Sequence, residues 1–539
     1  MLQRKPSLVN RAFWNFLGAS ILTTVAAQLA VSTDAAIVSH LMGPYAMAAV
    51  NMAMPVLTTF LSLNSLLGVG ASLLAAKAIG SRDSEEASRV FTAALYSVLA
   101  VGVVVTVASY ACCEQISRIV CTDDEIRPMV LSYLRVTSIG VTVLVLSGMM
   151  NMMVQSDGRP RLVTCAVIVG AVSNVVLDVV FIKVLGIAGS AWATVINYGV
   201  TVCITSSHLR RKSCSYRIVR FTKQVWHTLG TNLQQGLPLM IANVLLSVIV
   251  LLINKMVDGV LGSDGVYMVA VCIQLLLITF VVLNGVLDAT FAIGGMLLGE
   301  HDIMGLKLLN RKVMTFSCAV LVPFSAFVAF APSAMATLFG ADDPTLRAEL
   351  CRVLRIFSAI LLPFSLTVLL HGMYQVLGYL VLSVGVAVGQ VASIVVAVFA
   401  FTQVAAPNML WWGFPLSAGA MLLVQVGITW RMSRGKSVSP LTLIPAPDAA
   451  RTYSATVPSG QADEALAEVR QFLQNAKCPD SIAEKSLHFT EKSLTDTEAD
   501  ICIHIEDGEA VSIVLKDTSK PTPTTKQAFG ITIKSTQIS

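Results

Sequence analysis

Charged residues are scarce in this chain. Only 13% of its 539 residues are Asp, Glu, Lys or Arg, about half the share that soluble proteins carry. In contrast, 55% of the residues are hydrophobic, and the mean hydropathy is +0.74. So few charges cannot cover a water-soluble protein of this size, and a net charge of +5 gives no reason to expect a nucleic-acid partner. The composition therefore predicts a chain that lies mostly in a lipid bilayer.

Motifs for metals, redox chemistry and nucleotides are also missing. The eleven cysteines form no CxxC pair and no Cys/His spacing typical of zinc sites, so we expect ordinary thiols. A disulfide near Cys112, Cys113 and Cys121 is the alternative. No Walker A motif is present, so we do not expect ATP as an energy source.

Long apolar runs, by contrast, are abundant. A helix needs about 20 apolar residues to cross a bilayer, and runs this long and uninterrupted satisfy their backbone there only as helices. We therefore predict an all-α polytopic membrane protein. Its twelve predicted spans lie near 13–40, 53–77, 90–111, 130–154, 161–184, 188–208, 230–256, 268–296, 312–331, 350–377, 380–404 and 410–430.

Basic residues alternate between the predicted loops. Lys and Arg gather at the N-terminus, after the even-numbered spans and in the central segment LRRKSCSYRIVRFTK, whereas intervening loops such as TDDEIR are acidic or neutral. Basic loops stay in the cytoplasm. We therefore expect both termini to be cytoplasmic, in a multi-pass protein of the plasma (inner) membrane of a bacterium.

The two halves of the chain resemble each other. LRV at 134–136 matches LRI at 354–356, and AIGSRD at 78–83 matches LLGEHD at 297–302, at offsets of 220 and 219 residues. Each half holds six spans, an even number, so both copies share one orientation. This predicts two pseudo-symmetric six-helix lobes (a parallel repeat) around a cavity, as in secondary transporters that work by alternating access.

Composition divides the chain into five parts. Helical spacing in ADEALAEVRQFLQNA and alternation around Asp-Gly in ADICIHIEDGEAVSIVLKD predict a small α+β domain at the C-terminus. The predicted parts are an N-terminal lobe (1–210), a basic cytoplasmic linker (211–228), a C-terminal lobe (229–436), a Pro/Ala/Ser-rich linker (437–459) and a soluble cytoplasmic domain (460–539).

Three carboxylates interrupt the apolar runs. Asp34, Asp178 and Asp288 would each cost about 2.5–3.5 kcal/mol at the membrane centre, so we expect them to be paired, protonated or in a wet cavity. Asn174 lies four residues before Asp178, so their side chains share one helix face. Several such oxygens suit a sodium ion, and two close carboxylates suit a shared proton. The alternative is that these groups only hydrogen-bond neighbouring helices.

Four motifs carry a family resemblance. They are STDAAIVSHLMGPYAMAAVNMAMPV (32–56), GVGASLLAAKAIGSRDSEEA (68–87), SNVVLDVVFIKVLGIAGSAWATVI (173–196) and QQGLPLMIANVLLS (234–247). Over about residues 10–435 the chain resembles the multidrug and toxic compound extrusion (MATE) transporters. The resemblance implies an antiporter rather than an enzyme. It would use the energy of an ion gradient to export small amphiphilic, cationic molecules in exchange for sodium ions or protons, and it would need no cofactor.

One departure from the family pattern narrows the resemblance. Part of the family carries a glutamate in its seventh helix, but IANVLLSVIVLL has no acid. The chain instead resembles the branch with an aspartate in helix 1 and Asn-x3-Asp in helix 5. That resemblance implies a coupling site at Asp34, Asn174 and Asp178, completed by Thr194, where either a proton or a sodium ion would bind.

The substrate cavity is predicted from side chains near the repeat interface. Asp288 would attract a cationic substrate, with Gln155, Gln375 and Met150 as further lining residues. The alternative for each is ordinary helix packing. The expected partners are the small-molecule substrate and the lipid bilayer, with the protein as a monomer.

The C-terminal domain faintly resembles the GHKL-type ATPase fold. TEKSLTD (490–496), DTSKPTP (517–523) and AFGITI (528–533) stand at its motifs, but Thr495 replaces the magnesium-binding asparagine and Ser519 replaces a glycine. This indicates a degenerate module with a regulatory partner. Two alternatives to export stay open: a flippase for lipid-linked precursors of the same superfamily, and a membrane sensor that signals through this domain.

Overall fold

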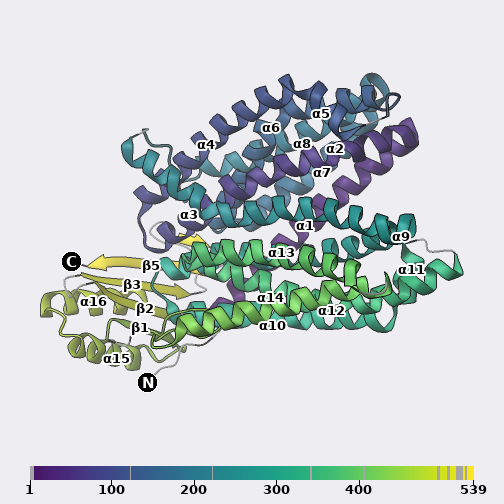
Figure 1. Cartoon of the computed structure of the whole chain (residues 1–539). Coiled ribbons are helices and arrows are strands. Elements are labelled where there is room, and N and C mark those ends of the chain that lie inside the picture. Colours follow the sequence, from purple (N-terminus) through teal and green to yellow (C-terminus); the bar gives the residue numbers. More distant parts are fainter. Residues whose placement is uncertain are drawn as a thin grey trace.

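In the computed structural model, the chain forms a bundle of long helices with a small α/β domain at one end (Figure 1). The structure describes residues 5, 7–121, 123–220, 222–339, 343–404, 407–448, 450–494, 498–506, 510–517, 526–528 and 531–538. We call the end of the bundle beside the small domain the domain end, and the opposite end the far end.

The N-terminal lobe precedes the basic linker, and the C-terminal lobe follows it. The N-terminal lobe contains α1 (Ser7–Met42), α2 (Pro44–Asn64), a π-helical turn (Ser65–Val69), α3 (Gly70–Gly80), α4 (Ser84–Ala111), α5 (Cys113–Val120), α6 (Arg127–Ser156), α7 (Pro160–Leu185), α8 (Ile187–Ser206) and a 3-10 turn (Ser207–Arg210). The C-terminal lobe contains α9 (Lys223–Gly299), α10 (Ile303–Phe330), α11 (Pro332–Leu338), α12 (Pro344–Val376), α13 (Leu380–Val404), a 3-10 turn (Pro407–Trp412) and α14 (Gly413–Ser433).

The predicted number of spans is confirmed. Twelve helical segments among the described residues are long and apolar enough to cross a membrane. Two of them, Lys223–Val257 and Asp264–Gly299, belong to α9. Between them Gly262 has φ 64° and ψ −155°, a conformation that glycine adopts far more readily than other residues. All eleven cysteines are free, so the disulfide alternative is wrong for this structure.

The repeat predicted from sequence is visible in the helix ends. α3 ends at Gly80 and α9 at Gly299, while α7 begins at Pro160 and α13 at Leu380. These offsets are the 219 and 220 residues of the sequence match. The two lobes lie side by side in Figure 1, with the C-terminal domain beside their common end.

The repeat extends to an unusual backbone conformation at the domain end. Arg82 and His301 occupy equivalent positions and both have positive φ, 62° and 58°, which is uncommon outside glycine. Each is followed by an aspartate that caps a helix. Asp83 accepts a hydrogen bond from Glu86 N at 2.7 Å, and Asp302 accepts one from Gly305 N at 2.8 Å. We call the two connecting segments, residues 81–83 and residues 300–302, the inner turns.

The lobes are in close contact in the half of the bundle nearer the domain end. A Cβ atom built at Gly236 would come within 1.9 Å of Leu66 O, and one at Gly70 within 2.1 Å of Asn232 O. Because only glycine allows helix backbones this close, the two positions mark tight inter-lobe packing. Asn243 Nδ2 also donates to Ser65 Oγ at 2.8 Å, beside the π-helical turn.

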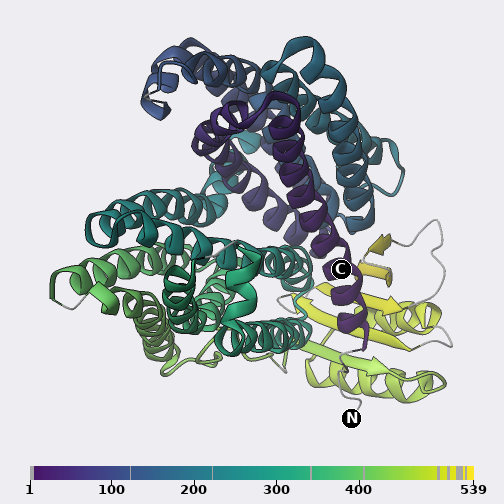
Figure 2. The same ribbon diagram turned by 90° about the vertical axis from the view of Figure 1, so that its right-hand side faces the viewer.

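Helix α1 packs against both lobes. Its first residues, including Phe13, Phe16 and Leu17, are buried in one apolar core with Leu283 of α9 and Leu306 of α10. Its later residues pack against α7 of its own lobe. Figure 2 shows α1 leaving the N-terminal lobe and running toward the C-terminal domain.

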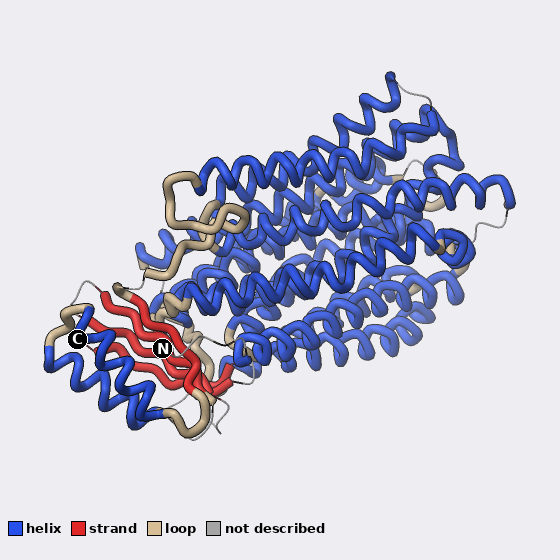
Figure 3. The backbone as a smooth tube through the Cα atoms, turned by 90° about the horizontal axis from the view of Figure 1, so that it is seen from below, coloured by secondary structure: helices blue, strands red, loops and turns tan. Residues whose placement is uncertain are grey.

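The C-terminal domain is a five-stranded antiparallel sheet with two helices. Its strands lie in the order β1-β2-β3-β5-β4. Figure 3 shows this sheet between its helices and the bundle. The elements are β1 (Thr452–Val457), α15 (Ala462–Asn475), α16 (Asp480–Ser493), β2 (Ala499–Glu506), β3 (Ala510–Asp517), β4 (Lys526–Ala528) and β5 (Ile531–Ile538).

Strand β1 corrects one predicted boundary. It lies within the segment predicted as a linker (437–459), yet it pairs with β2 along its whole length, from Thr452↔His504 to Val457↔Ala499. The Pro-rich composition just before it concealed a short β-forming run, TYSATV. The predicted hairpin is confirmed by the pairing of β2 with β3.

The GHKL resemblance depends partly on residues that the structure does not describe. Thr495, Ser519 and the Gly530 of AFGITI lie outside the described residues.

The two faces of this sheet have different neighbours. Ile501, Ile503 and Ile513 point into a core with residues of α15 and α16. Residues one position away along the same strands, such as Cys502 and Lys516, contact the bundle instead. Because side chains alternate along a strand, one face covers the domain's own core and the other meets the transmembrane helices.

Candidate functional site

Two carboxylates and their neighbours are buried in the far-end half of the N-terminal lobe. Asp34 lies on α1, and Asn174 and Asp178 lie one turn apart on α7. Their residues are 9%, 3% and 0% exposed. The structure therefore brings together three of the predicted coupling residues in a site shielded from solvent.

The hydroxyl group of this site comes from Ser190. Its Oγ donates a hydrogen bond to Asp34 Oδ1 at 2.8 Å, and the serine is fully buried. Thr194, the predicted hydroxyl, lies one turn later on α8 and is only half-buried, with no hydrogen bond to Asp34 among the described residues. The sequence signal for Ser190 was its spacing of four residues from Thr194, which places both on one face of α8.

Ser190 is held near Asp34 by the tight turn between α7 and α8. Gly186 has φ 63° and ψ −142° and connects the two helices directly. A Cβ atom at Gly189 would lie 2.2 Å from Phe181 O, so α8 begins in close backbone contact with α7. This short reversal places the start of α8 against the carboxylate on α1.

Among the described residues, no donor forms a hydrogen bond with Asp178. Both of its carboxylate oxygens are buried and without a hydrogen-bond partner there, as is Asn174 Nδ2. The carboxyl group lies beside that of Asp34, close enough for direct electrostatic interaction. Two unprotonated carboxylates repel each other and cannot hydrogen-bond, so this pair favours a proton or a cation between them.

The buried surroundings of Asp34 and Asp178 strengthen the preference of this pair for a proton or a cation. Tyr133 on α6 and Tyr198 on α8 lie within electrostatic range of Asp34. Buried apolar side chains, including Val38, Ile182 and Ile187, pack on the same helices next to the site. Interactions between charges are stronger in such a low-dielectric environment.

The residues present fit two kinds of ion. The carboxylates of Asp34 and Asp178, the amide of Asn174 and the hydroxyl of Ser190 are hard oxygen donors of the type that sodium and other hard cations prefer. A proton shared by the two carboxyl groups would equally satisfy the orphaned oxygens of Asp178. The donor set therefore allows sodium or a proton and does not choose between them.

A second polar site lies between the lobes. Gln155 of α6 and Asp288 of α9 line a cavity of about 10 Å³ together with Val69, Ser72, Met152 and Phe291. This volume holds about one water molecule. Asp288 and Gln155, two of the predicted cavity residues, thus lie together at the lobe interface, in a space too small for a substrate in this conformation.

Two predicted lining residues lie elsewhere. Met150 is 2% exposed and packs in the apolar core of the N-terminal lobe. Met152 lines the cavity instead, because two residues turn a helix by about 200°. Gln375 is fully buried and its Nε2 donates to Gln235 O, which ties α12 to α9.

A further buried cluster was not predicted. His208 Nε2 and Asp157 Oδ2 are 2.7 Å apart, and Ser215 N donates to the same oxygen at 3.2 Å. Cys214 lies within 4.8 Å of both side chains. These contacts satisfy Asp157 directly and fasten the basic linker to the end of α6.

The arrangement of lobes and site can be compared with known proteins. A family model described as MatE matches residues 19–180 and 238–402, which span most of both lobes. The chain belongs to the MatE family. Members of this family are transporters rather than enzymes, which confirms the prediction of a transporter.

Curated relatives of this MatE chain include multidrug export proteins. The "Multidrug export protein MepA" of Staphylococcus saprophyticus is 24% identical over 217 residues, which are 39% of this chain and 48% of that protein. The protein of the same name from Staphylococcus haemolyticus is 21% identical over 225 residues, 41% of this chain and 49% of that protein. The chain thus matches about half the length of these relatives.

Solved structures share the fold of this MatE chain. A MOP superfamily transporter from Pyrococcus furiosus, described with a binding pocket of reverse polarity, superimposes with a TM-score of 0.72 at 22% identity, over 80% of this chain and 98% of that one. An outward-facing MATE family multidrug resistance transporter of the MOP superfamily gives 0.71 at 22% identity, with the same coverage.

Proposed function

We propose that the protein is a secondary active antiporter that exports small amphiphilic, cationic compounds in exchange for protons or sodium ions by alternating access. The observation that carries this proposal is the buried pair of Asp34 and Asp178, whose oxygens require a proton or a cation. The two-lobed bundle of a transporter family supports it, as do the multidrug export proteins among the relatives.

Helix α1 supplies the physical link between ion and transport. Asp34 lies 17 residues after Leu17, about 25 Å along the helix. Leu17 is buried in the core that joins α1 to the opposite lobe. Ion entry neutralises the Asp34/Asp178 pair, changes the packing of α1 on α7 and α8, and thereby alters the inter-lobe contacts at the other end of α1. A ligand shifts such an equilibrium by its difference in affinity for the two states.

The orientation of the chain is part of the same proposal. The basic loops and the C-terminal domain lie at the domain end, so the positive-inside rule places that end and both termini in the cytoplasm. The close contact of Gly80 with Met296 supports a state that is closed on this cytoplasmic side. The staphylococcal relatives favour the plasma membrane of a bacterium as its location, with the protein working as a monomer.

The alternatives receive less support. A flippase for lipid-linked precursors would favour basic residues to hold a pyrophosphate, but the described residues that line the inter-lobe cavity include Asp288 and neither Lys nor Arg. The sensor hypothesis and a separate regulatory partner of the C-terminal domain stay predictions.

The test is transport in reconstituted vesicles under an imposed sodium or proton gradient. Asp178→Asn removes one of the two charges that bind the ion, so we expect substrate export that no longer follows the gradient. Asp288→Asn, the same substitution in the other lobe, serves as the matched control. We expect it to weaken binding of a cationic substrate and to retain ion coupling. Gradient-driven export by Asp178→Asn at the wild-type level would refute the site.

A further inference from the structure

The C-terminal domain is fastened to the inner turn of the C-terminal lobe by a buried ionic contact. Lys516 of β3 forms an ion pair with Glu300, and its Nζ lies 3.8 Å from Asp302 Oδ2. The three side chains are 9%, 3% and 0% exposed. Removing one partner from a buried ion pair is strongly destabilising, because the other charge stays buried.

Further contacts extend this attachment along the same turn. The rings of His301 and His504 are stacked, with centroids 4.0 Å apart and an angle of 11° between their planes. Ser454 Oγ donates to Asp302 Oδ1 at 3.2 Å, and Cys502 Sγ donates to Glu300 O at 3.7 Å. The attached residues come from β1, β2 and β3, so three of the five strands take part.

The same domain also holds the N-terminal lobe. Arg82, at the equivalent inner turn, donates from Nη2 to Ile513 O of β3. At the start of the chain, Lys5 N donates to Thr456 Oγ1 at 2.7 Å and Ser7 Oγ donates to Glu498 Oε1 at 3.0 Å. One small domain therefore binds both inner turns at once.

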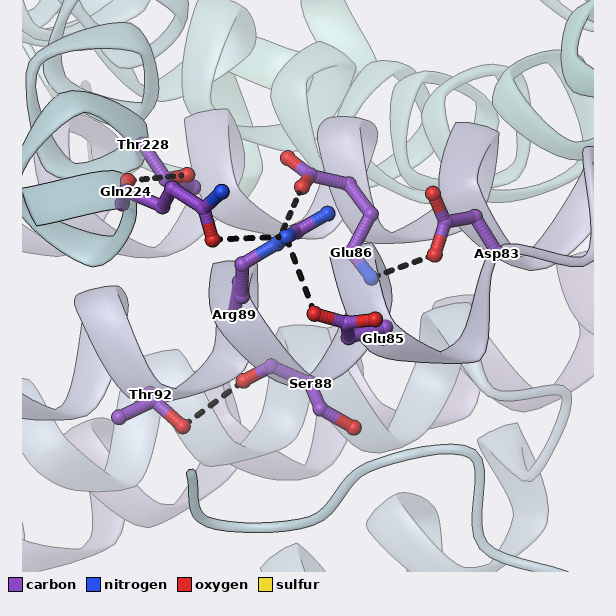
Figure 4. A network of polar contacts seen from close by, with 8 residues as sticks. All are labelled: Asp83, Glu85, Glu86, Ser88, Arg89, Thr92, Gln224 and Thr228. Atoms are coloured by element: carbon purple, nitrogen blue, oxygen red, sulfur yellow. Dashed lines mark hydrogen bonds and ion pairs between the residues drawn. The ribbon is translucent and has the colours of Figure 1, made fainter. Parts of the chain in front are cut away.

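The inner turn of the N-terminal lobe is also linked directly to α9. Asp83 caps α4, and Arg89 pairs with Glu86 at 2.8 Å and Glu85 at 3.2 Å (Figure 4). The Nη1 atom of Arg89 donates to Gln224 Oε1 on α9 at 3.1 Å. These contacts hold the turn that carries Arg82 close to the C-terminal lobe in the present conformation.

We propose that the C-terminal domain is an intramolecular clamp that holds the two lobes together at the domain end and restrains the opening of that end. The proposal rests on the alternating access described under Proposed function, in which the lobes separate at the domain end during each cycle. A domain bound to both inner turns cannot keep all its contacts when the turns move apart, so it must release one lobe.

The contact with the N-terminal lobe is the one that releases. A cavity of about 210 Å³ lies on that side of the domain, lined by Arg82, Ser215, Glu300 and Val514 among others. Arg82 Nη1 is buried beside it and has no hydrogen-bond partner in the part of the chain that the structure describes. Burial also lowers the pKa of Arg82 to about 10, and nearby Glu300 partly opposes this effect, so the group stays charged at neutral pH. When the N-terminal lobe is released, this under-satisfied cation moves into water and regains its hydration. Release of Lys516 would instead leave the carboxylates of Glu300 and Asp302 buried without their cation.

The test measures opening of the domain end in the full-length protein, without substrate or coupling ion. Ser72 is 5% exposed and lines the cavity between the lobes, and the close contact of Gly80 with Met296 lies between it and the domain end. In a Ser72→Cys background, a membrane-impermeant maleimide is added on the domain side. Modification of the peptide that carries residue 72 is then measured by mass spectrometry.

Lys516→Met detaches the clamp while keeping the length of the side chain. We expect the thiol introduced at position 72 to be labelled roughly tenfold faster than in the parent, because the buried carboxylates of the inner turn lose their cation. Lys534→Met is the matched control. Lys534 pairs with Asp517 at 2.8 Å within the domain, so its loss should leave labelling unchanged. Reversing the pair with Lys516→Glu and Glu300→Lys should restore slow labelling.

Two outcomes would overturn the proposal. One is labelling of the Lys516→Met protein at the parental rate, and the other is equally fast labelling of the Lys534→Met protein, which would assign the effect to general instability of the domain. Because the readout needs no export, a failed transport assay with Asp178→Asn would leave this result interpretable.

Discussion

Gly236 offers a test of the closed contact between the lobes in the half of the bundle nearer the domain end. A methyl group at this position would lie 1.9 Å from Leu66 O and 2.6 Å from Leu66 C, whereas ordinary van der Waals contact begins at 3.4 Å. These are backbone atoms, so no rotamer change relieves the clash. The two lobes must therefore separate at this point by about 1.5 Å, the difference between these distances.

The energetic effect can be bounded. Overpacking of a tightly packed interface typically costs about 1–3 kcal/mol. If the open state escapes that cost, the ratio of closed to open molecules falls roughly 5- to 150-fold for Gly236→Ala. The same factor limits each transport cycle, because the cycle requires the domain end to close.

The assay compares two alanine substitutions on one helix. Gly230 also lies on α9, but a Cβ atom there meets nothing within 4 Å, so Gly230→Ala is the matched control. We expect Gly236→Ala to speed labelling of a cysteine at position 72 from the domain side and to slow export, and Gly230→Ala to change neither. Unchanged labelling and export in a correctly folded Gly236→Ala protein would show that this contact does not close the domain end.

Two further predictions concern the ion site. Ser190→Ala should shift the ion concentration for half-maximal exchange roughly tenfold, the value of a hydrogen bond to a charged group. If the ion is sodium, this concentration should rise, because sodium loses a ligand. If the ion is a proton, the concentration should fall, because the charged carboxylate of Asp34 loses a hydrogen-bond donor and therefore binds a proton more readily. A larger shift in Thr194→Ala than in Ser190→Ala would contradict this assignment. Gly189→Ala should lower the thermal unfolding temperature, at a cost of about 1–3 kcal/mol, because its methyl group would meet the α7 backbone. Gly199→Ala on the same helix has open space and should be neutral; equal unfolding temperatures would refute the close contact.

The transmembrane part was predictable because its signal is long and repeated. Apolar runs of about 20 residues give the spans directly, and a constant offset between two halves gives the lobes. What such runs do not encode is local backbone detail. The positive φ of Gly262, between the spans Lys223–Val257 and Asp264–Gly299, and the π-helical turn beside Ser65 are backbone conformations that hydropathy does not register.

The candidate site was predictable in part. The cost of burying charge singled out Asp34 and Asp178, and helical spacing added Asn174. Their role in coupling stays a prediction. Ser190 was missed because it shares a helix face with Thr194, and spacing along one helix does not say which turn lies level with a carboxylate on another helix. The position of Ser190 level with Asp34 depends on the tight reversal of the chain at Gly186.

The position of the C-terminal domain could not be read from its sequence. Alternation in β2 and β3 predicts one apolar face and one polar face, and a polar face usually meets water. Here polar residues such as Lys516 and Ser454 meet the polar inner turn of a membrane protein instead. A recognition surface made of complementary polar groups has no distinct hydropathy pattern.

The duplicated inner turns have a consequence for the direction in which this domain attaches. A bundle with pseudo-two-fold symmetry offers an attached domain two similar binding sites, which are related by a half-turn about the symmetry axis. Arg82 and His301 share a backbone conformation and differ in chemistry, one offering a guanidinium donor and the other a flat ring for stacking. Each matches a different part of one asymmetric sheet. The chemical difference between these two residues therefore makes the two turns of the repeat distinguishable. A single copy of the domain can then attach in one orientation only.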